Sequence, residues 1–206
     1  CDVVLVCHPE LAEESLAVLR QAFTGMPVHF TGRHFRIENA EILPKCVQLP
    51  HPPLWMAAVS PDSFELAAQL GVGLLVGQFK PWFMVQSDIQ HYHAAWKKDQ
   101  GDTEEPARVG MTVGLMCLED GRRARELANL HITWFYRELL KQTAPVLKQL
   151  HAGYEYYKKM GSLKLVTEKT LNLTALETLG MVVAGDPAHC RQKLEAYRDA
   201  GVDHLL

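Results

Sequence analysis

The sequence lacks the features that mark several classes of protein. Its five cysteines include no Cys-x-x-Cys pair and are odd in number, which argues against a disulfide framework. Lys and Arg number 21 against 24 Asp and Glu, and the net charge of −3 does not favour nucleic acid or an acidic membrane as the main partner. No apolar run approaches the length of a membrane span. We therefore expect a cytoplasmic protein with reduced thiols.

Motifs of several common sites are also missing. No Gly-x-Gly-x-x-Gly follows a predicted strand, and Gly71-Val72-Gly73 opens a strand instead, so a Rossmann dinucleotide site is not supported. No Gly-x-Ser-x-Gly surrounds Ser60, which makes this residue a poor candidate for a serine nucleophile. No spacing of His, Cys and Asp indicates a metal site. A length of 206 residues favours one domain.

The two ends of the chain are unusual. The sequence begins with Cys1 rather than Met, and it stops at Leu206 inside a predicted strand. We therefore expect a piece of a longer protein.

Residues 54–68 organise the predicted fold. They begin as an apolar run between prolines and a Ser-Pro step, which is typical of a fully buried strand. Ser60 can then act as a helix N-cap and Pro61 suits the first helical position. The start of such a helix favours an anion, and the turn carries two hydroxyls, Ser60 and Ser63. Ser60 as a simple cap is the alternative that this pattern leaves open.

The remaining patterns alternate between strands and helices. Buried strands are expected before Ser60, Gly77 and Glu119 and at the C-terminus. Residues 28–37 are expected to form either a short extended segment or a hairpin. Helices are expected over 11–23, after Ser60, over 83–100, over 121–150 with a kink or break at Pro145, and after Asp186. This alternation predicts an α/β protein with a parallel sheet, either open or closed into a barrel.

Several segments together resemble the bacterial luciferase-like flavin monooxygenases. The likeness lies in the order and spacing of short motifs from about residue 11 onward. The matching residues are Pro44, Lys45, Val47, Gln48, Pro50, Pro52 and Pro53, then 55–58, Ser60, Pro61 and Ser63, then Ala67, Ala68 and Gly71, and finally 185–187, Leu194 and 200–204.

The resemblance implies a (β/α)8 barrel of the TIM type. It makes residues 54–59, 72–76, 108–118 and 202–206 strands five to eight, and 11–23 the helix before strand five. The chain is then a single luciferase-like barrel domain over 1–206 that lacks the first barrel half. Half a barrel exposes sheet edges, so self-association is also expected.

The resemblance also implies a cofactor site for FMN. Family members that bind FMN hold its phosphate at the turn after strand five, which corresponds to Val59, Ser60 and Ser63. Val59 replaces the family's usual acidic residue, so only its backbone contributes. Gly77 and Gln78, after strand six, are expected to line the flavin or substrate pocket, with a tight turn at Gly77 as the alternative.

The implied activity uses reduced FMN and O2 to oxygenate a small aldehyde- or alkane-like substrate, with a flavin reductase as partner. The family's catalytic His and reactive Cys lie in the first barrel half, so the catalytic residues are unknown here. A deazaflavin-dependent oxidoreductase on the same barrel and an inactive half-barrel that only binds a partner or self-associates are the alternatives. Residues 162–178 are polar and weakly patterned, and they are expected to form a mobile loop with short helical pieces that acts as a lid over the flavin.

Overall fold

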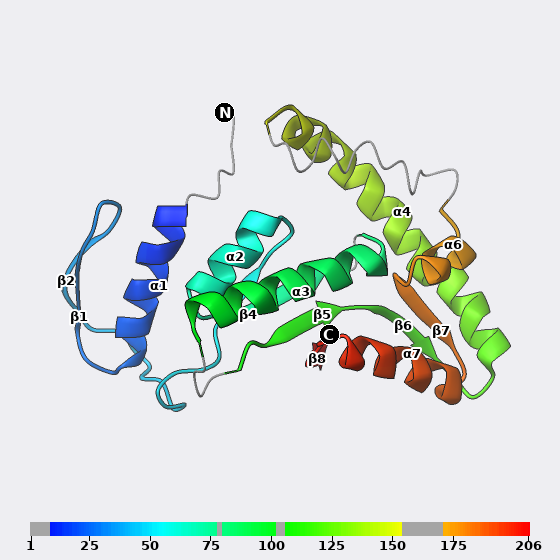
Figure 1. Cartoon of the computed structure of the whole chain (residues 1–206), viewed down its shortest axis with the longest axis horizontal. Helices are drawn as coiled ribbons and strands as arrows, with labels where there is room; N and C mark the ends of the chain where they lie inside the picture. Colours follow the sequence, from blue (N-terminus) through cyan, green and yellow to red (C-terminus); the bar gives the residue numbers. More distant parts are fainter. Residues whose placement is uncertain (1–8, 78–79, 102–105, 154–170) are drawn as a thin grey trace. The chain divides into compact units, whose positions relative to one another are not determined.

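The computed structural model describes residues 9–77, 80–101, 106–153 and 171–206, and the side chains of all of these except Pro9 and 144–153 (Figure 1). The chain divides into two compact units, Cys1–Trp55 and Met56–Leu206. Across the described ranges, every helix is too short or too polar to cross a membrane. That residues 1–206 form one barrel domain stays a prediction.

The first unit contains a helix and a hairpin. Helix α1 (Pro9–Phe23) has Glu10 in its first turn and Arg20 in its last, which suits the helix dipole. Strands β1 (Val28–Thr31) and β2 (Arg36–Ala40) pair in antiparallel fashion, which confirms the expected hairpin. Glu14 of α1 accepts three backbone N–H groups at the hairpin turn, from Arg33 at 2.7 Å, His34 at 2.9 Å and Phe35 at 3.1 Å.

A four-stranded sheet is the centre of the second unit. Its order is β3 (Trp55–Ala57), β4 (Gly73–Gly77), β5 (Val109–Thr112) and β8 (His204–Leu205). Strand β5 is parallel to both β4 and β8, so their carboxyl ends lie along the same edge of the sheet. This confirms the predicted α/β class with a parallel sheet.

Two helices bury one face of this sheet. Helix α2 (Pro61–Gln69) and helix α3 (Trp82–Asp99) lie against each other beside β4 (Figure 1). The side chains of Phe64, Leu74, Ile89 and Met111 are fully buried here. Burying an apolar side chain of this size stabilises the fold by roughly 1.5–3 kcal/mol. The apolar periodicity of both helices therefore has the predicted role.

The segment 108–118, predicted as barrel strand seven, does not form one continuous strand. Residues 108–118 divide into β5 and β6 (Gly114–Cys117), and β6 pairs in parallel with β7 (Val182–Gly185) in a separate two-stranded sheet. The prediction was wrong because a single, mostly apolar run does not reveal that its two halves pair with different strands. The sequence had shown 181–184 only as a short apolar stretch.

Three helices surround this second sheet. Helix α4 (Gly121–Gly153) packs on β6 and β7, followed by α6 (Leu173–Thr178) and α7 (Pro187–Asp199) (Figure 1). Helix α4 continues past Pro145, so the predicted break there was wrong, and the alternative of a kink stays a prediction. The carboxylate of Asp186 accepts the N–H of His189, which confirms Asp186 as the predicted N-cap. These elements share an apolar core that comprises Ala128, Tyr136, Leu171, Leu173, Leu176, Met181, Val182 and Ala184.

The prediction for residues 162–178 is confirmed in one part. Helix α6 is one of the short helical pieces expected there. Leu171, Leu173 and Leu176 are buried in the core, so residues 171–178 are packed rather than a polar loop. Residues 162–170 lie outside the described residues, and the lid stays a prediction. The Asn172 side chain caps α6 by accepting the N–H of Ala175 at 2.9 Å.

The outer strands of the larger sheet are less buried than predicted. Of the expected strand 54–59, only Trp55–Ala57 is strand, and its residues are half-buried or exposed. Both residues of β8 are also exposed. Each is an edge strand with one neighbour, whereas β4 and β5 have two and are almost wholly buried.

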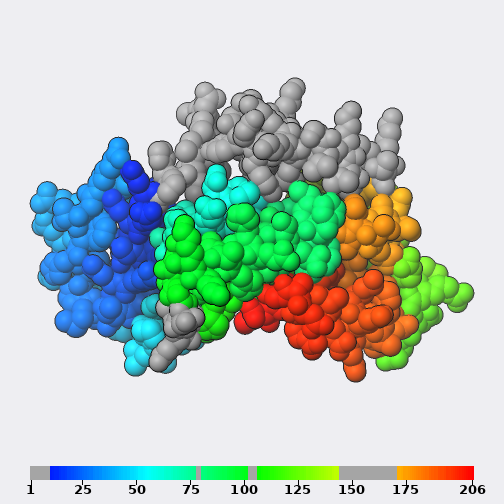
Figure 2. All heavy atoms as spheres, viewed as in Figure 1, coloured from blue at the N-terminus to red at the C-terminus, as the bar shows by residue number. Residues whose placement is uncertain are grey.

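The C-terminal segment is fixed to α3 and β5. Gly201 has φ of +99°, and a Cβ on it would lie 3.0 Å from His93 Nε2 of α3. Figure 2 shows the red C-terminal segment directly against the green segment that contains α3. Asp203 accepts the Val109 N–H through its carboxylate at 2.7 Å and donates its own N–H to the Val109 carbonyl oxygen at 2.9 Å.

Candidate functional site

The turn between β3 and α2 brings the two predicted serines together. Ser60 occupies the N-cap position with extended backbone angles, and Pro61 begins the helix. Its hydroxyl makes no capping hydrogen bond. It lies instead 2.8 Å from the hydroxyl of Ser63. The backbone N–H groups of Ser63 and Phe64 are satisfied by the Ser60 carbonyl oxygen, at 3.0 and 3.2 Å.

Ser60 occupies the N-cap position of α2, but its side chain does not cap the helix through a hydrogen bond. A serine that only capped α2 would direct its oxygen at a backbone N–H of the first turn. Here the two hydroxyls form a pair at the positive end of the helix dipole. Each hydroxyl can donate one hydrogen bond and accept others, so the pair can rearrange to hold an anion.

A buried lysine adjoins the turn. Lys80 is only 5% exposed, and its ammonium donates to the Val59 carbonyl oxygen at 3.2 Å. It also forms an ion pair with Asp88 of α3 and lies 5.3 Å from the ring centre of Phe64. A lysine is rarely buried unless it is paired. Sequence reasoning missed Lys80, and its only signal was a single cation in the apolar stretch between β4 and α3.

Asp88 limits the positive charge that Lys80 presents. Burial raises the pKa of the Asp88 carboxyl above its ordinary value. The hydrogen bond from Lys80 and the positive charge of Lys80 offset part of this rise. The ion pair thus places a cation and a partly desolvated acid beside the start of α2. The lysine holds the end of β3 to the segment after β4.

The remaining predicted site residues occupy neighbouring positions. Val59 is 44% exposed and directly precedes Ser60. Gly77 is the last residue of β4 and lies opposite Thr112 of β5. Gln78 lies outside the described residues. The four described residues therefore lie at or just after the carboxyl ends of two adjacent strands, β3 and β4, where α/β barrel enzymes place their sites.

The histidines do not assemble into a second site. His91 is exposed on α3 and lies 3.5 Å from Glu65 of α2, and His29 accepts the Asn39 N–H within the hairpin. In the part of the chain that the structure describes, no three His, Cys, Asp or Glu side chains gather as metal ligands.

A parallel sheet with intervening helices and a polar cluster at its carboxyl edge is typical of α/β enzymes, both open and barrel-shaped. The described strands do not close into a barrel. The model of the luciferase-like monooxygenase family matches residues 9–204. The chain belongs to this family, whose members are flavin monooxygenases and related oxidoreductases.

Solved structures share the fold at low sequence identity. The monooxygenase RslO1 from Streptomyces bottropensis is 20% identical with a TM-score of 0.60, over 94% of this chain and 51% of that one. The coenzyme F420-dependent tetrahydromethanopterin reductase from Methanopyrus kandleri is 16% identical with a TM-score of 0.64, over 96% and 56%. The oxygenating constituent of 3,6-diketocamphane monooxygenase from Pseudomonas putida, solved with FMN, is 14% identical with a TM-score of 0.57, over 95% and 55%.

The chain spans about half the length of the solved structures that it matches. These likenesses establish the fold.

Proposed function

We propose that the chain is the flavin-phosphate-binding part of a monooxygenase that uses reduced FMN and O2 to oxygenate a small aldehyde- or alkane-like molecule. A flavin reductase would supply the reduced FMN. The residues that we assign to the cofactor are the backbone of Val59, the hydroxyls of Ser60 and Ser63, and Gly77, together with Gln78.

The paired hydroxyls of Ser60 and Ser63 carry this proposal. Neither is needed to cap α2, and both stand at its N-terminus, where a phosphate is stabilised by the helix dipole. Their donors fit the acceptor oxygens of a phosphate. The 3,6-diketocamphane monooxygenase constituent was solved in complex with FMN, which is consistent with such a group on this fold.

The chain's residues would bind and orient the cofactor. Ser60 and Ser63 would donate hydrogen bonds to the phosphate, and Lys80 would add positive potential while it holds the Val59 carbonyl in place. Gly77 has no side chain to obstruct approach to the edge of β4. Reduced FMN, when bound, supplies the electrons that activate O2, and the surrounding protein excludes water.

A deazaflavin-dependent oxidoreductase is the second candidate. Two fold neighbours, the tetrahydromethanopterin reductase and a secondary alcohol dehydrogenase, are F420-dependent, so the same fold accommodates a deazaflavin in those proteins. Titration of the chain with both cofactors separates the two proposals. Preference for the deazaflavin by tenfold or more would replace the FMN assignment.

Binding of FMN tests the proposed site. We would titrate the purified chain with oxidised and dithionite-reduced FMN and follow quenching of flavin fluorescence or change of absorbance. Ser60→Ala and Ser63→Ala are expected to weaken binding tenfold, which corresponds to about 1.4 kcal/mol. Ser15→Ala is the matched control, because the Ser15 hydroxyl bonds only to the Leu11 carbonyl oxygen within α1. It is expected to leave binding unchanged.

Two outcomes would overturn the assignment. Binding that neither serine variant weakens would place the phosphate elsewhere. The absence of binding by a cooperatively folded chain would favour the third candidate, a half-barrel that only associates with a partner or a second copy. The open edges at β3 and β8 make such association physically reasonable, and an apparent mass near twice 23.2 kDa would support it.

A further inference from the structure

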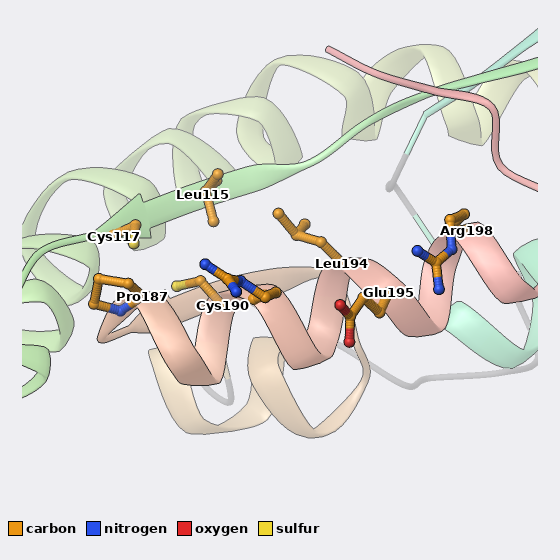
Figure 3. Close-up of a pocket in the computed structure, with 8 residues that line it drawn as sticks. Leu115, Cys117, Pro187, Cys190, Leu194, Glu195 and Arg198 are labelled. Carbon is orange, nitrogen blue, oxygen red and sulfur yellow. The ribbon is translucent and has the colours of Figure 1, made fainter.

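A groove lies between β6 and α7 and shares no lining residue with the serine turn. It has a volume of about 420 Å³ and is lined in part by Leu115, Pro187 and Leu194. Two cysteines, Cys117 and Cys190, line the same groove (Figure 3). The proposed flavin site uses neither of them.

The fold brings these two cysteines together. Cys117 is the last residue of β6 and lies opposite Gly185, the last residue of β7. The turn at 185–187 then leads into α7, where the Cys190 N–H donates to the Asp186 carbonyl oxygen at 2.9 Å. The first turn of this helix therefore returns Cys190 to the end of β6.

Distances from the Cys190 sulfur support this placement. Cys190 Sγ lies 3.7 Å from the carbonyl oxygen of Gly185 and 3.9 Å from that of Met116, the residue directly before Cys117. Figure 3 shows the Cys190 side chain directed towards the strand end that carries Cys117. Because Met116 directly precedes Cys117, the two cysteines lie at the same end of the groove.

The two thiols differ in accessibility. Cys117 is exposed, whereas Cys190 is only 3% exposed. Burial is the main cause that raises the pKa of the Cys190 thiol to about 11. A side-chain hydrogen bond with Cys117 and the charge of Cys117 act on this pKa in the same direction. Because Cys117 is exposed and Cys190 is buried, Cys117 is the residue that an oxidant in solution meets first.

We propose that Cys117 and Cys190 form a dithiol that hydrogen peroxide oxidises to an intramolecular disulfide. The Cys117 thiolate attacks one peroxide oxygen, which breaks the O–O bond and gives Cys117 sulfenic acid and hydroxide. The Cys190 sulfur then attacks the Cys117 sulfur, and the sulfenic oxygen leaves as water with the Cys190 proton. In sum, two thiols lose two electrons and two protons, and one peroxide becomes two waters.

The disulfide would fix the end of β6 to the first turn of α7. It would close one end of the groove and restrict the unfolded chain, so the oxidised protein is expected to melt at a higher temperature than the reduced protein. A dithiol reductant would reverse both effects.

Peptide mapping of the full chain tests this proposal. The reduced protein is treated with one equivalent of hydrogen peroxide, its remaining thiols are alkylated, and it is digested with trypsin without reduction. Cleavage after Lys and Arg places Cys117 alone in peptide 109–122 and Cys190 alone in peptide 170–191. We expect these two peptides to be linked, with the mass of two hydrogens missing, and to separate after reduction.

Variants supply the controls. Cys46→Ser removes a thiol of the first unit and should leave the linked peptide unchanged, whereas Cys117→Ser should abolish it and leave Cys190 reduced. The same treatment in concentrated urea should lower the yield of the linked peptide severalfold, because the fold no longer holds the sulfurs together. Peroxide treatment of the folded chain that leaves both thiols free, or that converts Cys117 to a sulfinic acid without linkage, would overturn the proposal.

Discussion

The ammonium group of Lys80 lies 3.2 Å from the carbonyl oxygen of Val59, so a residue that follows β4 is hydrogen-bonded to the segment that follows β3. The contact joins two chain segments that meet only in the folded sheet. The contact also places the ammonium group beside Val59, the residue that directly precedes Ser60. The buried ion pair with Asp88 holds Lys80 in this position.

Replacement of Lys80 by Met should destabilise the fold by roughly 3 kcal/mol, because it leaves the buried Asp88 carboxylate without its cationic partner. Urea unfolding measures the loss. Lys97→Met on the exposed face of α3 is the matched control and should cost little. The double variant Lys80→Met/Asp88→Leu should recover most of the stability. A single variant as stable as the wild type would contradict this account of the pair.

Substitution of Glu14 by Gln should weaken the hairpin in a pH-dependent way. Burial acts to raise the pKa of the Glu14 carboxyl. Hydrogen bonds from the backbone N–H groups of His34, Arg33 and Phe35 outweigh this effect and lower the pKa below its ordinary value of 4.5. The ionised carboxylate therefore stabilises the folded state above that value, and this contribution is lost as the pH falls through the lowered pKa.

The difference in unfolding free energy between the wild type and Glu14→Gln should be fully present at about pH 6, and it should shrink as the pH falls through the lowered pKa of Glu14. Glu13→Gln serves as the control, since Glu13 is the exposed neighbour on the same helix. A difference that did not change with pH would show that the charge of Glu14 is irrelevant to the hairpin.

Gly180→Ala should destabilise the protein more than Gly101→Ala. Both glycines have φ of +66°, so both substitutions introduce backbone strain of roughly 1–2 kcal/mol. A Cβ on Gly180 would also lie 2.6 Å from Trp82 Cβ, whereas nothing lies within 4 Å of one on Gly101. The overlap should add about 1–3 kcal/mol to the loss at Gly180. Thermal and urea unfolding of the two variants measure the two contributions. Equal losses of unfolding free energy would show that Trp82 moves aside at no cost.

The sequence predicted those features whose signals are local. The apolar run, the Ser-Pro step and the following helical spacing sufficed to place Ser60 at the start of α2. The Gly-Asp-Pro step likewise placed Asp186 at the start of α7. Both depend on helix-capping rules that act within a few residues.

Features that depend on distant partners could not be predicted in this way. The division of 108–118 into β5 and β6 follows from β5 pairing with β4 and β8 while β6 pairs with β7. The role of Lys80 depends on Val59, 21 residues earlier. The same applies to Cys117 and Cys190, which no short motif links.

The bond between Asp203 and Val109 has a consequence for the order of folding. The carboxylate that accepts the first N–H of β5 belongs to a residue 94 positions later in the chain. Strand β5 can pair early with β4, but its other side must wait until α4, α6, β7 and α7 have formed and returned the chain to the sheet. Contacts this distant carry a large loop-closure entropy and slow folding. We therefore expect β8 to be the last strand that the sheet acquires, and the first that it releases.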